Sequence, residues 1–318
     1  MNVLRSWLVS LWLCILLWVP VDAAEMSPLM SATEIRTSIQ HIARELQQGY
    51  LDPVKAKVAS DKLLSTLASG GFDRAFDQAR FHHEVSTLLI QATGDRNISL
   101  LPNDMTVSTT QSTANALSTA AFEQIRADIS ADNIGYLSLQ GQLTPAHSQL
   151  LLKQLKFLAS VDALIIDLRL ADEASLSFVQ QLLSHVVPAD TPLMDVKFNH
   201  RLETLTAAQT AGFHHLQTEV PLYILTSSFV AGSWEFFCYS LQQLARAKIV
   251  GEATMGLSQL SKVVKVSDTT VLRMNYAAFS HPRTGESWHL EGVLPDYYFS
   301  GEAALTKAQQ LAFGSVRK

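Results

Sequence analysis

The sequence contains very little cysteine and no excess of positive charge. Only two of the 318 residues are cysteines, and the formal net charge is -5. This charge excludes the basic field that attracts nucleic acid, and no run of like charge marks a binding tail. The chain also lacks a phosphate-binding or dinucleotide-binding glycine motif and the cysteine and histidine spacing of a zinc site. We therefore expect no nucleic-acid partner, no cofactor and no metal.

The first 23 residues have the pattern of a signal peptide. Arg5 precedes an almost unbroken apolar run over residues 7–19, Pro20 ends the run, and cleavage is expected after Ala23. A retained membrane anchor is the alternative, but the run is shorter than the roughly 20 residues of a spanning helix. The bulky residues before Cys14 exclude a lipoprotein signal. We expect a periplasmic or secreted protein with no stable membrane insertion after cleavage.

Removal of this leader leaves one cysteine, Cys238, which cannot form an internal disulfide. It lies on an apolar stripe of a predicted helix. We interpret it as a small buried hydrophobic residue rather than a nucleophile.

Residues 24–101 are predicted to form a small helical domain. Ser31 and Glu34 fit a capping box that opens the first helix, and apolar residues then recur at helical spacing. Two further amphipathic helices are predicted over residues 55–68 and 81–92. These helices would form a small bundle or a cap on the following domain. Residues 102–120 are rich in serine, threonine, alanine and asparagine, which predicts a linker.

Residues 121–318 alternate between strand and helix patterns, which predicts an α/β domain with a largely parallel sheet. The strands at 163–168 and 222–226 are nearly continuous apolar runs, as expected for strands that are buried on both faces. The other predicted elements are strands at 134–139 and 248–251, helices at 146–158, 176–187 and 231–245, and a hairpin of strands 263–266 and 271–276.

Six segments, in order, resemble one family, the tail-specific or C-terminal processing serine proteases and the related modules of interphotoreceptor retinoid-binding protein. The segments are ATGDR at 92–96, DNIGY at 132–136, LIIDLR at 164–169, LTS at 225–227, AKIVGE at 247–252 and EGVLPD at 291–296. The resemblance implies a ClpP/crotonase-like core and a peptide or protein tail as partner. The chain shows no clear PDZ segment, which is typical of the retinoid-binding-protein-like branch.

The positions that carry catalysis in this family are changed here. The family's nucleophilic serine lies three residues before a glutamate, and counting back from Glu235 gives Gly232, which has no hydroxyl. The lysine base follows the V-G-E segment, and Leu257 stands at that position. A leucine cannot remove a proton from a serine.

The turn that supplies oxyanion N–H groups in the family is rich in glycine. Here the corresponding residues 170–174 read LADEA and contain no glycine, and Asp172 and Glu173 would add negative charge beside a developing oxyanion. Three changes at three catalytic positions predict a degenerate active site that binds peptides without catalysis.

Ser233 is the residue that could still provide a nucleophile. One residue along a helix rotates a side chain by about 100°, so Ser233 should point away from the family's nucleophile position. We interpret it as a helix N-terminal residue that satisfies backbone N–H groups. The alternative function is an active serine peptidase that uses Ser233. A third hypothesis, binding of an apolar ligand, rests on the resemblance to the retinoid-binding modules alone.

Two pairs of adjacent histidines are candidate metal ligands, His82 with His83 and His214 with His215. Adjacent residues on a helix or strand point to different sides, which makes them poor chelating pairs. We interpret all four as surface histidines. Lys262, the nearest lysine after Leu257, is interpreted as a solvated charge at the edge of a strand.

Overall fold

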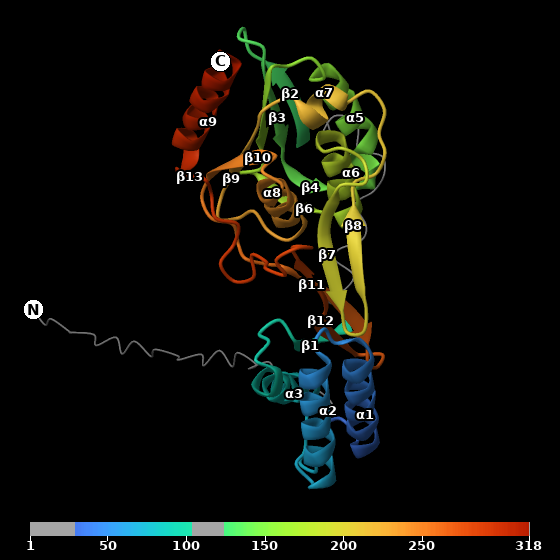
Figure 1. Cartoon of the computed structure of the whole chain (residues 1–318). Helices are drawn as coiled ribbons and strands as arrows, with labels where there is room; N and C mark the ends of the chain where they lie inside the picture. Colours follow the sequence, from blue (N-terminus) through green and yellow to red (C-terminus); the bar gives the residue numbers. More distant parts are fainter. Residues whose placement is uncertain (1–28, 104–123, 318) are drawn as a thin grey trace, which may run out of the picture.

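A computed structural model describes residues 29–103 and 124–317. Three layers follow one another along the long axis of the molecule: the N-terminal helices, an antiparallel sheet, and a larger α/β part (Figure 1). The predicted signal peptide and most of the predicted linker at 102–120 lie outside the described residues. Within the described ranges, no helix combines the length and the apolar character needed to cross a membrane.

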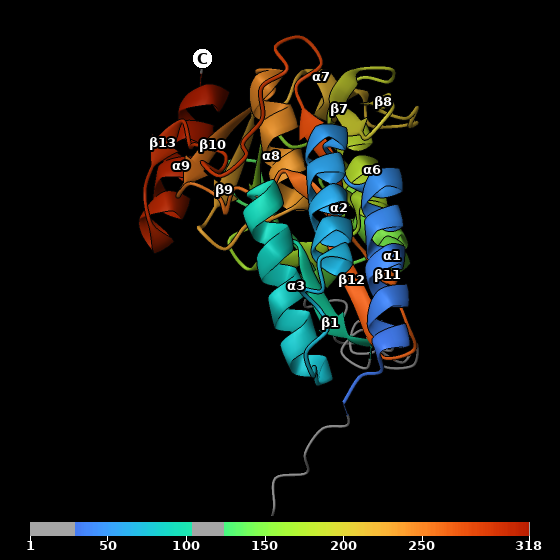
Figure 2. The same cartoon turned by 90° about the horizontal axis from the view of Figure 1, so that it is seen from below.

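The three predicted N-terminal helices are present as α1 (Ala32–Gly49), α2 (Pro53–Ala68) and α3 (Gln78–Thr93). The capping box is confirmed, because the Glu34 N–H donates to Ser31 Oγ at 3.2 Å and the Ser31 N–H donates to Glu34 Oε2 at 2.7 Å. Gly94 ends α3 in a left-handed conformation with φ 70°. Figure 2, which views the molecule from below, shows the three helices side by side in front of the rest of the chain.

The helices pack on a five-stranded antiparallel sheet, of which the sequence predicted only the hairpin. The strand order is β1-β12-β7-β8, and β11 pairs with β12. The strands are β1 (Ser99–Pro102), β7 (Pro192–Phe198), β8 (Leu202–Thr206), β11 (Gln259–Lys265) and β12 (Thr270–Ser280). Leu272 and Met274 of β12 share one apolar core with Ile39, Leu46 and Phe81 of the helices. The helices therefore cap this sheet rather than form a free bundle.

The predicted largely parallel sheet is confirmed as a six-stranded sheet in the order β13-β10-β9-β5-β3-β2. Every neighbouring pair is parallel except β2 with β3. The strands are β2 (Ile125–Ile129), β3 (Ile134–Leu139), β5 (Ala163–Asp167), β9 (Leu222–Thr226), β10 (Ala247–Gly251) and β13 (Tyr297–Tyr298). All residues of β5 and β9 are buried, as their apolar runs predict.

Helices cover the two faces of this sheet unequally. On one face lie α5 (Ser148–Phe157), α6 (Leu176–Val186) and α8 (Ser233–Gln243), whose apolar sides join one large core with the sheet. On the other face α9 (Gly301–Val316) packs on β5, β9 and β10 through the buried residues Ala304, Ala308 and Ala312. The smaller elements are β4 (Gly141–Leu143), a 3₁₀ turn (Pro145–His147), β6 (Ala171–Ala174) and α7 (His214–Thr218).

The interpretation of His82 as a surface residue is wrong. Its side chain is buried where α3 meets β12, and its Nε2 lies 2.9 Å from Thr270 Oγ1. The prediction failed because the face of α3 that carries His82 packs against β12 of the antiparallel sheet. In an isolated helical bundle this face of α3 would be exposed. Burial lowers the pKa of His82 below its ordinary value of 6.5.

His185 on α6 is a buried histidine whose two ring nitrogens have no hydrogen-bond partner in the described part of the chain. Its ring packs edge-on against Phe213 at 4.6 Å, and burial lowers its pKa from 6.5. The unfolded chain therefore takes up this proton at a higher pH than the folded chain does. The contribution of neutral His185 to the free energy of unfolding is therefore fully present above pH 6.5. It is lost as the pH falls towards the lowered pKa.

We expect His185→Leu to reduce the loss of stability in mild acid. The free energy of unfolding, measured by urea denaturation at pH 7 and at pH 5, should fall less in the variant than in the parent protein. The exposed residue His214 provides a control, because His214→Leu should leave the pH dependence nearly unchanged. Equal acid losses in the parent and the His185 variant would contradict the expectation.

Candidate functional site

The turn between β9 and α8 has the geometry that suits a nucleophile, but glycine occupies the key position. Gly232 precedes α8 with φ 58° and ψ -117°, a region that residues other than glycine enter only under strain. In the described part of the chain, no heavy atom other than those of residues 231–233 lies within 4 Å of the place that a Cβ of residue 232 would take. The backbone therefore has room for a side chain that the sequence does not supply.

Glu235 holds this turn in place from inside the protein. Its side chain is fully buried on the first turn of α8. Oε2 accepts the Gly232 N–H at 2.9 Å and the Leu257 N–H at 2.8 Å, and Oε1 accepts the Gly256 N–H and the Thr254 hydroxyl, both at 2.6 Å. Four donors match the acceptor capacity of an ionised carboxylate, which compensates for its burial.

One carboxylate oxygen thus joins the two positions at which the family resemblance predicts the nucleophile and the base. Because Gly232 and Leu257 both donate to Oε2, their backbone nitrogens lie no further apart than two hydrogen-bond lengths. The Leu257 side chain is 42% exposed, so a longer polar side chain would meet no packing obstacle towards solvent. The structure brings the two positions together, and neither side chain can take part in proton transfer.

The glycine-free turn after β5 lies next to the turn between β9 and α8. The Ser227 hydroxyl donates to Arg169 O at 3.1 Å, which links the turns that follow β9 and β5. Residues 171–174 form the short strand β6, which pairs with β4, and the Gly141 N–H donates to Leu170 O at 3.0 Å. The segment that supplies oxyanion donors in the family is thus engaged in strand pairing here.

Ser233 and Cys238 both lie on α8. Ser233 is the first residue of the helix and is half-buried, and its hydroxyl has no hydrogen-bond partner in the described ranges. The interpretation of Ser233 as a helix N-terminal residue is confirmed, but its hydroxyl does not satisfy backbone N–H groups: Gly232 stands at the cap, and Glu235 accepts the Gly232 N–H. Cys238 is fully buried, which raises the pKa of its thiol far above the ordinary value and makes it a poor nucleophile.

The LIIDLR segment of β5 has a structural role. Asp167 accepts the Tyr136 hydroxyl at 2.6 Å and the Arg169 guanidinium at 2.7 Å, and Arg169 also donates to Gly301 O at 2.6 Å. Burial, together with the hydrogen bond to Asp167, raises the pKa of Tyr136 to about 12. These contacts tie β5 to β3 and to the start of α9.

The V-G-E and E-G-V segments are explained by close backbone contacts. A Cβ at Gly251 would lie 2.1 Å from Thr226 O, and a Cβ at Gly292 would lie 2.1 Å from Thr254 O. Only glycine allows such an approach. The first contact fixes β10 against the end of β9, and the second fixes the loop that carries Leu257.

The closing aspartate of EGVLPD is bound to β10. Asp296 accepts the Ile249 N–H and the Lys248 ammonium, both at 2.9 Å. Burial alone would raise the pKa of Asp296, but Lys248, the Ile249 N–H and Gln242 together hold it below its usual range. The matched segments therefore preserve the framework around Gly232.

Exposed apolar side chains surround this framework, and we call them the apolar rim. Its members are Leu170, Phe229, Met255, Leu257 and Leu290, and each is between 42% and 81% exposed. Backbone hydrogen bonds hold their segments together, since the Met255 N–H donates to Val230 O and the Leu290 N–H donates to Gly256 O. Exposed apolar groups in such a cluster are typical of an interaction surface.

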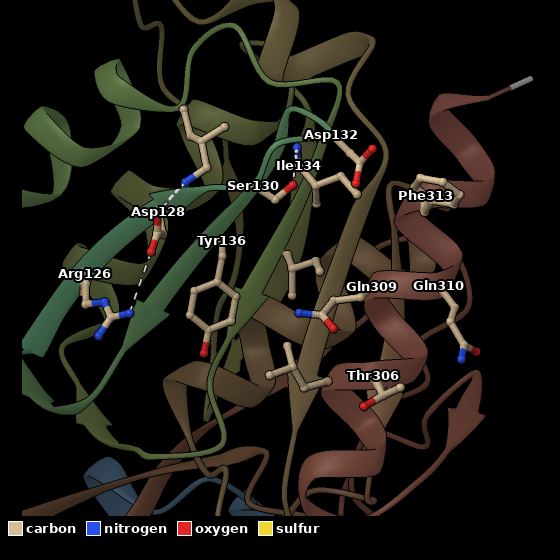
Figure 3. Close-up of a pocket in the computed structure, with 13 residues that line it drawn as sticks. Arg126, Asp128, Ser130, Asp132, Ile134, Tyr136, Thr306, Gln309, Gln310 and Phe313 are labelled. Atoms are coloured by element: carbon tan, nitrogen blue, oxygen red, sulfur yellow. Dashed lines mark hydrogen bonds and ion pairs between the residues drawn. The ribbon is translucent and has the colours of Figure 1, made fainter.

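A separate groove of about 870 Å³ lies between α9 and strands β2 and β3 (Figure 3). Ile134, Tyr136 and Ile165 line it from the sheet, and Leu305 and Phe313 line it from α9. None of its lining residues belongs to the turn at Gly232 or to the apolar rim. The volume is large enough for a ligand, but the groove is not the site that the matched segments define.

Comparison with known proteins identifies the class. Residues 133–299 match the profile described as "Peptidase family S41", and this match covers more than half of the chain. The chain belongs to peptidase family S41, the family of C-terminal processing and tail-specific proteases.

Solved structures share the fold at low sequence identity. The photosystem II D1 C-terminal processing protease matches at a TM-score of 0.64 with 13% identity, over 85% of this chain and 94% of that one. A lipoprotein from Streptococcus agalactiae matches at 0.58 with 15% identity, over 91% and 99%. A putative peptidase from Parabacteroides merdae matches at 0.57 with 13% identity, over 89% and 96%. At these identities the similarity shows the fold alone.

We expect Glu235→Gln to destabilise the protein by about 2–3 kcal/mol, because an amide nitrogen would then face backbone N–H donors. Urea denaturation at pH 7 measures this change. Glu173→Gln, which removes an exposed carboxylate on β6, should change the free energy of unfolding by no more than about 0.5 kcal/mol. Equal effects of the two substitutions would show that the buried carboxylate does not hold the turn.

Proposed function

We propose that this protein is an S41 family member that binds peptides or protein tails without cleaving them. The observation that carries the proposal is the pairing of Gly232 and Leu257 across one Glu235 oxygen, in a framework that is held by the close backbone contacts of Gly251 and Gly292. A serine hydroxyl and a lysine amine at these positions would supply the nucleophile and the base. Glycine and leucine leave the positions adjacent but without either group.

The apolar rim supports a binding role. Its side chains remain in water although nothing in the catalytic framework requires them to be apolar, and an extended peptide with apolar side chains would cover them. Leu257 belongs to both features, because its backbone is held by Glu235 and its side chain lies on the rim. Leucine instead of a lysine base at position 257 thus adds apolar surface for peptide binding and removes the group that would accept a proton.

The proposal includes export and a place within the family. The leader-like pattern of residues 1–23 supports a periplasmic or secreted protein. Residues 94–133 separate α3 from β3, which is fewer than the roughly 50 residues of a small domain, so a PDZ domain does not fit there. This spacing supports the retinoid-binding-protein-like branch, and the parallel sheet with its flanking helices supports a ClpP/crotonase-like core.

The first test measures binding and cleavage with the same peptides. Fluorescent peptides with apolar C-terminal residues should bind the mature protein and remain intact during long incubation. Replacement of two rim residues by charge, Phe229→Asp with Leu257→Asp, should weaken binding about ten-fold or more, because charged groups would displace apolar contacts. Val54→Asp changes an equally exposed apolar residue on α2 and should leave binding unchanged.

Ser233→Ala separates this proposal from an active peptidase. Cleavage by the parent protein that disappears in Ser233→Ala would establish Ser233 as a displaced nucleophile and would refute the proposal. Absence of both cleavage and binding, in a protein that is folded by circular dichroism, would refute the binding role.

The second test restores the missing groups. We expect Gly232→Ser combined with Leu257→Lys to give slow but measurable peptide hydrolysis, since a Cβ at residue 232 meets no neighbour and residue 257 is partly exposed. The positive φ of residue 232 should cost the serine variants about 1–3 kcal/mol of stability.

Each single variant is a matched control for the restoration. Gly232→Ser lacks a base and Leu257→Lys lacks a nucleophile, so both should remain inactive. A double variant that is folded and binds peptide but does not cleave would show that the oxyanion turn, and not only the two side chains, has been lost.

A further inference from the structure

Strand β2 lies at the edge of the six-stranded sheet and pairs, among the described residues, with β3 alone. Its five residues read Ile125, Arg126, Ala127, Asp128 and Ile129. The strand is symmetric about Ala127: isoleucine stands at both ends, and opposite charges flank the centre. This pattern is self-complementary when the strand pairs antiparallel with a second copy of itself, because each arginine then faces an aspartate.

The free backbone groups of β2 can be assigned from its ladder with β3. At one end the Gln140 N–H donates to Gln124 O at 2.8 Å, and at the other the Ser130 N–H donates to Ile134 O at 2.9 Å. Antiparallel ladders alternate, so the even-numbered residues of 124–130 bond to β3. The odd-numbered residues 125, 127 and 129 therefore direct their N–H and C=O groups to the free edge.

The side chains alternate in the same way. Arg126 and Asp128 are exposed on the face that carries the groove beside α9, where Figure 3 shows them along β2. They lie 3.8 Å apart, and each is about two thirds exposed (69% and 66%). Ile125, Ala127 and Ile129 lie on the opposite face, in or against the main core.

We propose that β2 pairs antiparallel with β2 of a second copy of this chain, about a two-fold axis at Ala127. The free groups of residue 127 would bond to the same residue of the second copy, and those of residue 125 to residue 129. Arg126 would then lie opposite Asp128 of the second copy, in a non-hydrogen-bonded pair, which is the arrangement that brings side chains closest. Both charges occur twice across the axis.

One existing contact must be exchanged when the pair forms. Asp128 Oδ1 accepts the Ile129 N–H at 2.9 Å in the single chain, which covers one of the outward donors. On pairing, this N–H bonds to the second copy and the carboxylate turns to Arg126 of that copy. Charged residues on an edge strand usually prevent pairing with another strand, because like charges would then face each other. Here the two-fold symmetry places Arg126 of one copy opposite Asp128 of the other, so opposite charges face each other.

Pairing at this edge would join two copies through one continuous sheet. Because the axis is normal to the sheet, the grooves beside the two α9 helices would open on the same face, one on each side of the new strand pair. Five residues from each chain make a small contact area, so a weak dimer that depends on concentration is expected.

Sedimentation equilibrium of the mature protein over a wide range of concentration tests the pairing. The parent should approach twice the monomer mass at high concentration. Arg126→Asp should weaken association about ten-fold or more, because it places like charges across the axis twice. Arg126→Asp combined with Asp128→Arg should restore association to near the parent level, since the reversed pair is again complementary.

Lys57→Asp is the matched control. Lys57 is an exposed lysine in an ion pair with Asp61 on α2, and its replacement changes the net charge by the same amount as Arg126→Asp without affecting β2. It should leave association unchanged. A parent protein that remains monomeric at every concentration, or a dimer that responds equally to both substitutions, would overturn the proposal.

Hydrogen exchange provides a second, independent readout. The N–H groups of residues 125 and 127 should exchange several-fold more slowly at a concentration that favours the dimer, whereas those of 126 and 128, which bond to β3, should change little. A dimer without this alternation would place the interface elsewhere and would also overturn the proposal.

Discussion

The buried carboxylate of Glu235 is the interaction on which the site depends. A charge with no exposed surface is tolerated only when every lone pair has a donor, and here three backbone N–H groups and one hydroxyl meet that condition. The donors come from two segments that are about 20 residues apart in sequence. The position of the turn at Gly232 and that of the loop at Leu257 are therefore not independent, and a shift of either would leave a buried charge or a buried N–H without a partner.

Under the proposed function, this coupling explains how the framework persists when the catalytic side chains are absent. The contacts that hold the site are made by Glu235 with three backbone N–H groups and the Thr254 hydroxyl, whereas a serine-lysine reaction would depend on the side chains at positions 232 and 257. Replacing those side chains by glycine and leucine leaves every donor to Glu235 in place. At positions 232 and 257, stability thus depends on the backbone N–H groups, whereas catalysis would depend on the side chains. A change of side chain can therefore abolish activity and leave the hydrogen bonds to Glu235 intact.

The sequence predicted those parts of the fold that have a clear pattern of apolar residues within a short segment. The apolar runs of β5 and β9 and the periodicity of the helices could be interpreted directly. The antiparallel sheet under α1–α3 was largely missed because β8 is short and half polar, and because β1 follows α3 with no pattern of its own. The burial of His82 was missed with it, since burial there depends on a strand that lies almost 190 residues further along.

The candidate site was predicted in part for the same reason. Gly232 and Leu257 could be located by counting from Glu235 and from the V-G-E segment, which the family resemblance supplies. That one glutamate oxygen joins them could not be read from the sequence, because it depends on how a helix start and a distant loop approach each other. The expectation that the Ser233 hydroxyl satisfies backbone N–H groups failed for a related reason: a serine next to a helix start is usually a cap, but here the glycine before it takes that place.

The path of the chain through the sheets also has a consequence for how the protein folds. β1, near residue 100, pairs with β12, near residue 275, and α9 covers β5, β9 and β10 only from the extreme C-terminal end. Neither sheet is complete until nearly the whole chain is available, and closing such long loops is entropically costly. Folding is therefore expected to be slow. The apolar face of β5, β9 and β10 stays exposed to water until α9 docks on it.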